Sequence, residues 1–299
     1  MRHFLNLIDV TPDEIRTLLR EASRLKAAHQ RGQGKPLLRG RVLGLVFEKP
    51  SLRTRVSFET AIAQLGGTGI FMAGHEVGIG SRESVPDIAR TISQYVDAVV
   101  LRTFQQTTIE TFAEYATCPV INGLSDYNHP CQALGDLLTM RELFGALAGR
   151  TIAFIGDGNN VARSLALVGA LAGVQVRVAA PRGFQLEADA GAELFDDPDE
   201  AVAGADAVYT DVWVSMSDDD SEAARRREAL APFQLSDALL DLAAPHAIAL
   251  HCLPAHPGEE ITASVLYGDR QRIWDQAENR RHAQKALLEL LVSAEQDGG

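Results

Sequence analysis

Short apolar runs, rich in β-branched residues, alternate along this chain with stretches in which apolar residues recur at helical spacing. Such runs are typical of strands that are buried on both faces of a parallel sheet, and their alternation with helices indicates βαβ units. The pattern therefore predicts an α/β fold with two doubly wound parallel-sheet domains joined by interdomain helices. The predicted strands cover residues 42–47, 96–101, 119–122, 151–155, 174–179, 207–214 and 247–250.

Helical spacing defines the segments between these strands. Phe58, Ile62 and Leu65 follow the i, i+4, i+7 rule and predict a helix that ends at the glycine pair 66–67. Residues 131–144 form a longer amphipathic helix that is closed by a glycine and followed by a new strand, so we expect a domain boundary within residues 130–150. Residues 14–28 and 277–294 are also predicted to be helical, and the second of these helices is able to return to the first domain.

Composition limits the classes of protein to which this chain can belong. It has 299 residues, of which 46% are hydrophobic, and this is enough to build a large core, most simply in two domains. Its net charge of -12 argues against a nucleic-acid partner, because a phosphate backbone is bound by an extended basic face. Any anion that it binds should therefore be small and held in a pocket.

Targeting signals and cysteine usage favour the cytosol. The longest apolar run, residues 165–174, is too short to cross a bilayer, and the first residues lack the form of a signal peptide. Three cysteines, Cys118, Cys131 and Cys252, are odd in number and far apart, which fits reduced thiols better than a disulfide framework. We expect a cytoplasmic protein.

The most informative segment, residues 51–55, lies between the first predicted strand and the start of the helix that follows it. It contains the hydroxyls of Ser51 and Thr54 and the guanidinium groups of Arg53 and Arg55. The first turn of a helix carries backbone N–H groups without intrahelical partners, and the helix dipole adds a partial positive charge there. The segment predicts a phosphate site, although a serine N-cap followed by solvated arginines is an open alternative.

Polar residues recur at the carboxyl ends of six of the seven predicted strands, and this end is the binding edge of an open α/β sheet. A chance scatter of polar residues would not select the same end six times. We therefore expect a binding crevice, situated between two domains. The six groups are residues 51–55, Arg102, residues 129–132, residues 156–160, Asp211 with Ser215 and Met216, and residues 251–254.

Two of these groups suit a phosphate or a neutral carbonyl ligand. Arg102 ends a strand and is either a surface ion-pair partner or a fixed donor to a phosphate or carbonyl oxygen. His129 precedes a proline in a turn and has amides nearby in Asn128 and Gln132. A lone histidine in a turn is most often structural, but together these groups suit a carbonyl or amide ligand.

Other chemistries fit the motifs less well. The turn after the strand 151–155 resembles a dinucleotide fingerprint, but Val161 replaces its third glycine and the next strand lacks a ribose-binding acid, so NAD binding is not expected. The turn instead offers Asn159 and Asn160 to a small polar ligand. His251, Cys252 and His256 lack a second cysteine and do not predict a zinc site, whereas Cys252 as an acyl-enzyme nucleophile stays open. Serine hydrolase and kinase markers are missing from the sequence.

Five motifs, in order across nearly the whole chain, resemble those of the ornithine carbamoyltransferases. The first two resemble aspartate carbamoyltransferases in kind as well, whereas the other three resemble the ornithine branch. The motifs are Ser51-Leu-Arg-Thr54-Arg, His129-Pro-Cys-Gln132, Asp157-Gly-Asn-Asn160, Asp211-Val-Trp-Val-Ser215-Met216 and His251-Cys252-Leu253-Pro254.

The resemblance implies the reaction, the two domains and the residues that serve them. Residues 1–130, joined by the C-terminal helix 277–295, would bind carbamoyl phosphate, and residues 131–276 would bind L-ornithine. It also implies a homotrimer or a multiple of trimers, with the site near a subunit boundary, and neither a metal nor an organic cofactor. The residues implied for carbamoyl phosphate are Ser51, Leu52, Arg53, Thr54, Arg102, His129, Pro130, Gln132, Cys252, Leu253 and Arg280. Those implied for ornithine are Asn160, Asp211, Ser215 and Met216, and those implied for catalysis are Thr54, Arg102, His129 and Cys252.

Three positions depart from the pattern of the family. Leu52 stands where a hydroxyl residue is usual, Ser217 replaces a glycine, and Gly78 occupies a position where relatives often place a glutamine from the adjoining subunit. The expected reaction makes L-citrulline and phosphate, as a step of arginine metabolism. Transfer to another amine, such as putrescine or an N-acylated ornithine, and a catalytically silent ligand-binding homologue are the alternatives.

Overall fold

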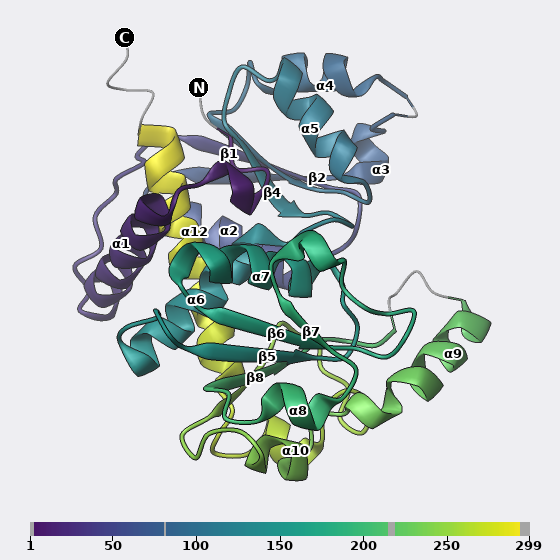
Figure 1. The fold of residues 1–299 in the computed structure, drawn as a ribbon. Helices are drawn as coiled ribbons and strands as arrows, with labels where there is room; N and C mark the ends of the chain where they lie inside the picture. The colour runs from purple at the N-terminus through teal and green to yellow at the C-terminus, as the bar shows by residue number, and fades with distance from the viewer. Residues whose placement is uncertain (1–2, 81, 215–218, 294–299) are drawn as a thin grey trace. The chain divides into compact units, whose positions relative to one another are not determined.

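The computed structural model describes residues 3–80, 82–214 and 219–293, and Figure 1 shows its helices and strands. The chain divides into two compact units, one made of the described residues of Met1–Leu138 and Asn279–Gly299, the other of Thr139–Glu278. The division falls within helices α6 (Pro130–Phe144) and α12 (Ile273–Ser293). Each unit has its own parallel sheet, so the predicted fold class is confirmed.

The first unit is built on a four-stranded sheet in the order β2-β1-β3-β4, in which every pair is parallel. Apolar residues of β1, β3 and β4 pack against α4 and α5, which cover one face of the sheet. The strands are β1 (Val42–Phe47), β2 (Thr68–Ala73), β3 (Ala98–Arg102) and β4 (Val120–Leu124). The helices are η1 (Leu7–Asp9), α1 (Pro12–Gln30), α2 (Leu52–Gln64), α3 (Gly74–Val77), α4 (Val85–Ile92) and α5 (Gln106–Tyr115), together with parts of α6 and α12.

The second unit contains a five-stranded parallel sheet in the order β7-β6-β5-β8-β9. Its core joins residues of β5, β8 and β9 to α8, α10 and α11. The strands are β5 (Thr151–Ile155), β6 (Gln175–Ala179), β7 (Glu193–Phe195), β8 (Ala207–Thr210) and β9 (Ile248–His251). The helices are α7 (Asn160–Ala172), η2 (Ala188–Ala190), α8 (Pro198–Val202), α9 (Asp220–Leu230), η3 (Ala231–Phe233), α10 (Asp237–Asp241) and α11 (Ala263–Leu266).

All seven predicted strands are present, but two observed strands were missed. These are β2 and β7, each of which is one of the two edge strands of its sheet. Both are partly exposed, unlike the other edge strands β4 and β9, and neither forms the continuous apolar run by which buried strands are recognised. The prediction for residues 207–214 was too long, because β8 ends at Thr210 and Asp211 already lies outside the ladder. Among the described residues no helix is both long and apolar enough to span a membrane.

Candidate functional site

Four of the six polar groups found in the sequence follow the strands between which the strand order reverses in each sheet. In the first sheet the chain runs from β1 outward to β2 and from β3 outward to β4, so the reversal lies between β1 and β3. Residues 51–54 follow β1, and Arg102 ends β3. In the second sheet the reversal lies between β5 and β8, which are followed by Asn159 and Asp211. Ligands of open α/β sheets bind at such reversals.

The N-terminus of α2 presents an anion site in the first unit. Ser51 is its N-cap, and the Ser51 hydroxyl accepts a hydrogen bond of 3.3 Å from the backbone N–H of Thr54. The capping role left open by the sequence is thus observed. It orders the first turn of α2 and leaves the backbone N–H groups of Leu52 and Arg53 unused by the cap. Leu52 directs its side chain outward, with 74% of the residue exposed, so only its backbone is suited to bind a phosphate.

Thr54 joins two guanidinium groups behind this helix end. Its Oγ1 accepts hydrogen bonds from Arg280 Nη2, at 3.0 Å, and from Arg102 Nη1, at 3.5 Å. Because both lone pairs of the hydroxyl are then used, its proton can only be donated onward, for example to an oxygen of a ligand. Thr54 and Arg280 are both buried. The structure thus brings together three residues that the sequence assigned to one ligand.

Arg55 does not join this group. Its Nε donates to Glu59 at 3.1 Å, and its guanidinium stacks 3.7 Å from the centre of the Phe71 ring. The sequence grouped Arg55 with Arg53 as a cation for a phosphate, but in the structure the Arg55 charge already has a carboxylate partner in Glu59 on the next turn. Arg53, which is half-buried, is the remaining cation of the segment.

His129 is buried among the cations of this cluster. Burial lowers its pKa well below the usual value, and the charges of Arg280, Arg102 and Arg53 lower it further. The imidazole is therefore neutral near pH 7 and can donate one hydrogen bond to a ligand without adding charge. Pro130 follows it as the first residue of α6.

Gln132 offers an oriented amide oxygen. Its Nε2 donates to Oδ1 of Asp136 at 2.8 Å, which fixes the amide so that Oε1 is its free acceptor. That oxygen is buried and has no hydrogen-bond partner among the described residues. A buried acceptor without a partner is unfavourable by about 1–3 kcal/mol, and a ligand N–H would remove this penalty. Asp136 was not identified from the sequence, where it is one of several polar residues in an amphipathic helix.

Asp211 organises the cluster in the second unit. Its carboxylate accepts hydrogen bonds from Asn159 Nδ2 at 2.8 Å, from Cys252 Sγ at 2.7 Å and from the backbone N–H of Val212 at 2.8 Å. Asn159 also caps α7 through Oδ1. The sequence suggested that Asn159 contacts a ligand, but both ends of its side-chain amide are used within the protein, so it shapes the site instead. Asn160 begins α7 and is half-buried.

Cys252 and Leu253 lie in a loop that is held by a buried pair. His251 Nε2 lies 3.1 Å from Glu260 Oε1, and both side chains are fully buried. His251 Nδ1 accepts the backbone N–H of Leu253 at 2.8 Å, although Leu253 has a φ of 62°, which is rare outside glycine. Burial alone would raise the pKa of Glu260, but hydrogen bonds from His251 and from the His256 backbone lower it below its usual value. Glu260 was missed from the sequence; its only signal there is an acid next to an apolar run.

The Asp211 contact argues against Cys252 as a nucleophile. A thiolate next to a carboxylate is disfavoured by like charge, and reactive thiolates instead stand beside cations. A metal is not favoured here either. Donor atoms of Asp211, His251 and Cys252 lie within 4.8 Å of one another, as do those of His256, Glu259 and Glu260. However, both ring nitrogens of His251 and the carboxylate of Glu259 already have protein partners.

Four residues singled out in the sequence are still to be placed. Ser215 and Met216, expected to hold ornithine, and Ser217 lie outside the described residues. Gly78 is the C-cap residue of α3 and has a φ of 68°, a left-handed conformation that favours glycine.

Two family models match consecutive parts of the chain. Residues 2–142 match the carbamoyl-P binding domain of aspartate/ornithine carbamoyltransferase, and residues 148–291 match its Asp/Orn binding domain. The ornithine carbamoyltransferase of Acidothermus cellulolyticus is 52% identical, with 98% of this chain and 97% of that protein covered. The chain belongs to the ornithine carbamoyltransferase family. The prediction made from its motifs is confirmed.

Further members of the family agree with this assignment. The ornithine carbamoyltransferase of Halorhodospira halophila is 49% identical, over 98% of this chain and 99% of the relative. The structure of the ornithine carbamoyltransferase from Pyrococcus furiosus superposes with a TM-score of 0.94 at 44% identity, and covers 98% of this chain and 97% of its own. That from Thermus thermophilus gives a TM-score of 0.89, also at 44% identity, over 96% and 98% of the two chains.

Proposed function

We propose that this protein transfers the carbamoyl group of carbamoyl phosphate to the δ-amine of L-ornithine, which yields L-citrulline and phosphate. Membership of the ornithine carbamoyltransferase family over nearly the full length supports the reaction. The single observation that carries it is the cluster around Thr54, where a helix N-terminus, Arg102 and Arg280 converge beside a neutral His129.

Carbamoyl phosphate binds to the first unit in this proposal. The N–H groups at the start of α2, the Ser51 and Thr54 hydroxyls and the Arg53 guanidinium hold the phosphate, because anions are stabilised at helix N-termini and by charged donors. Arg102, His129 and Arg280 address the carbamoyl oxygen. The amide oxygen of Gln132 accepts an N–H of the carbamoyl group, which would give this buried acceptor the partner that it lacks among the described residues.

Ornithine binds to the second unit, with Asn160, Asp211, Ser215 and Met216 at its α-amino and α-carboxylate groups. Cys252 and the Leu253 carbonyl lie near the δ-amine. A free alkylamine of this kind has a pKa of about 10.4 and is protonated at pH 7, so desolvation in the site must favour the neutral form before it can attack. Asp211, fixed by three donors, keeps its carboxylate in one orientation for this ligand.

The reaction forms a C–N bond and breaks a C–O bond, and one proton is transferred. The δ-nitrogen attacks the carbamoyl carbon, the C–O bond to phosphate then breaks, phosphate leaves with the bonding electrons, and the proton lost by the nitrogen passes to the departing phosphate, directly or through solvent. The tetrahedral oxyanion that forms on the way is stabilised by Arg102, His129 and Thr54, and removal of one such donor typically lowers the rate by about 10²–10³-fold. We propose that the chain does this without a metal or an organic cofactor.

The wider assignments are also proposals. The domain division at residues 1–130 with 277–295 and 131–276 follows the two substrates, and we propose a homotrimer or a multiple of trimers that acts in arginine biosynthesis. We propose a cytoplasmic location because Cys118, Cys131 and Cys252, all described residues, form no disulfide, as expected in a reducing compartment.

An assay of citrulline formation tests this function. We expect turnover with L-ornithine, and a kcat/KM at least about 10²-fold lower for putrescine and for N-acetylornithine, because a site that binds charged α-groups rejects analogues without them. Arg53→Ala and Arg102→Ala should lose activity by orders of magnitude, whereas Arg90→Gln, at an exposed arginine of α4, should keep it. Full activity in the first two variants, or none in the parent protein, would refute the proposal.

A further inference from the structure

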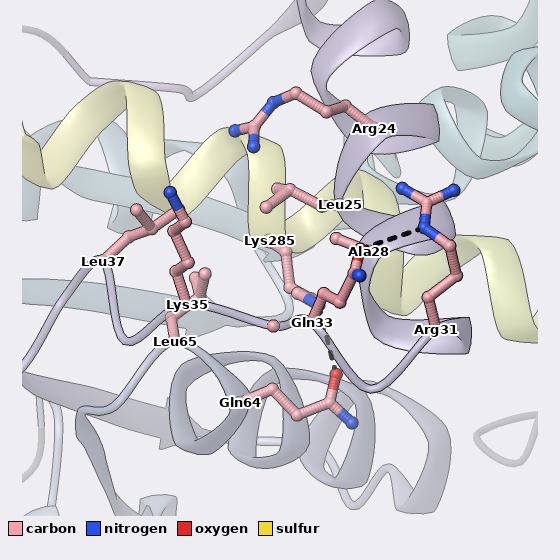
Figure 2. Close-up of a pocket in the computed structure, with 11 residues that line it drawn as sticks. Arg24, Leu25, Ala28, Arg31, Gln33, Lys35, Leu37, Gln64, Leu65 and Lys285 are labelled. Atoms are coloured by element: carbon pink, nitrogen blue, oxygen red, sulfur yellow. Dashed lines mark hydrogen bonds between the residues drawn. The ribbon is translucent and has the colours of Figure 1, made fainter.

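A pocket of about 340 Å³ lies in the first unit, away from every residue that we assign to catalysis (Figure 2). It is enclosed by the last turns of α1, the segment that follows it, the end of α2 and one side of α12. A volume of 300–1,000 Å³ with an apolar wall and a few polar groups is typical of small-molecule sites.

The charge of this pocket is opposite to that of the protein. Its lining contains Arg24, Arg31, Lys35 and Lys285 and no acidic residue, in a chain with a net charge of -12. Arg24 is paired with Glu21 at 2.6 Å and Glu289 at 3.3 Å, so its charge is already balanced. Among the described residues the other three cations form no ion pair with a carboxylate. Positive potential is therefore concentrated in the pocket.

Lys285 provides a second, independent observation. The residue is only 3% exposed, and its Nζ donates to the neutral amide oxygen Oε1 of Gln64 at 3.2 Å (Figure 2). Burial lowers its pKa, the charge of Arg281 lowers it further, and Glu289 opposes the shift. A buried ammonium group that has only an amide partner is poorly compensated, and a bound anion would compensate it.

The remaining walls are suited to an apolar body. Leu25 and Leu65 are buried beside the cations, and Ala28 and Leu37 extend the same surface. Arg31 lines the pocket as well, and its Nε donates a hydrogen bond of 3.1 Å to Gln33, so the hydrogen bond does not use its terminal nitrogens (Figure 2). Planar guanidinium groups are well suited to phosphate and carboxylate.

We propose that this pocket is a second ligand site, for a small organic anion that carries a phosphate, phosphonate or carboxylate group on an apolar body. The anionic group lies between Lys285, Lys35 and Arg31, and the apolar part lies on the leucines. The site is separate from the phosphate cluster at α2, since none of its lining residues belongs to that cluster.

Calorimetric titration of the whole protein with phenylphosphonate tests the proposal. We expect saturable binding of one phenylphosphonate molecule per chain at the pocket. This binding should be retained in an Arg53→Ala variant, in which the phosphate cluster is impaired. Neutral benzyl alcohol should show no saturable binding. Lys285→Met should weaken phenylphosphonate binding at least about tenfold, because it removes the buried positive charge that would face the anion. Lys35→Gln, at an exposed residue, should weaken it about two- to fivefold.

Arg90→Gln is the matched control, since it removes an exposed arginine of the same unit that does not line the pocket. It should bind phenylphosphonate as the parent does. No saturable binding in the Arg53→Ala protein, or equal affinity in the Lys285, Lys35 and Arg90 variants, would overturn the proposal. Because the readout is binding and not citrulline formation, it stands apart from the test of the catalytic function.

Discussion

Arg280 and Thr54 share a hydrogen bond of 3.0 Å although 226 positions separate them in the sequence. The bond places the C-terminal helix α12 against the start of α2, so the helix N-terminus gains a second guanidinium group besides that of Arg102. This contact makes a capped helix into a candidate phosphate site, because two guanidinium groups then meet at one buried hydroxyl beside the helix N-terminus.

Thr54→Val tests the contribution of the Thr54 hydroxyl separately from that of the side-chain volume. Valine keeps the volume but cannot accept from Arg102 or Arg280 or donate to a ligand, so we expect kcat for citrulline formation to fall about 10²–10³-fold, with the KM for ornithine little changed. Steady-state kinetics with both substrates varied would measure this. Thr60→Val, on the same helix, is the control and should retain parental kinetics. Equal kcat values in the two variants would contradict the role of Thr54.

His129 should make the protein sensitive to acid. Its pKa is lowered in the folded state, whereas in the unfolded chain it is about 6.5, so above pH 6.5 both states are neutral. Below that value only the unfolded state gains a proton, and stability is lost until the folded pKa is reached. We expect the difference in unfolding free energy between parent and His129→Gln to shift against the parent as the pH falls from 7.5 to 5.5.

Urea unfolding of both proteins at the two pH values, at one protein concentration, measures this shift. The comparison cancels the titration of groups that the variants share. If the two proteins lost stability in parallel, His129 would titrate normally and would not be the neutral group that we describe.

Glu260→Gln should weaken the loop that carries Cys252 and Leu253. The change removes the charge that faces His251 in a fully buried pair, so we expect a loss of about 1–3 kcal/mol in unfolding free energy and a raised KM for ornithine. Glu259→Gln is the neighbouring control. Glu259 is partly exposed and pairs with Arg227, and its loss should change stability by less than about 1 kcal/mol. A normal KM for ornithine in Glu260→Gln would show that the pair is structural only.

The three thiols should differ in reactivity. Burial raises the pKa of Cys131 to about 12, Cys118 is buried as well, and Cys252 is half-buried. We expect iodoacetamide at pH 8 to modify Cys252 first, as detected by peptide mass spectrometry. We also expect ornithine to slow the modification of Cys252. Asp211→Asn should speed it, because the neighbouring carboxylate opposes the thiolate. Labelling of Cys131 before Cys252 would contradict this order.

The sequence predicted much of the site because strand ends are local features. Continuous apolar runs identified β1 and β5 to the residue, and polar residues directly after such runs must lie at one edge of a parallel sheet. The edge strands β2 and β7 were missed for the converse reason, since partial exposure leaves no such run. The family was also accessible, because its motifs are short and contiguous.

The partners of those residues were decided by the tertiary structure. Arg55 has Glu59 four residues further along the same helix, whereas its stacking on the ring of Phe71 depends on the packing of α2 against β2. Likewise Asp136 fixes the amide of Gln132, and Glu260 holds His251, through contacts that form only when helices and loops have packed. The alternation of apolar and polar residues specifies which elements form and at which sheet edge their side chains lie. Which charge is neutralised, and which donor is left for a ligand, depends on long-range contacts and burial.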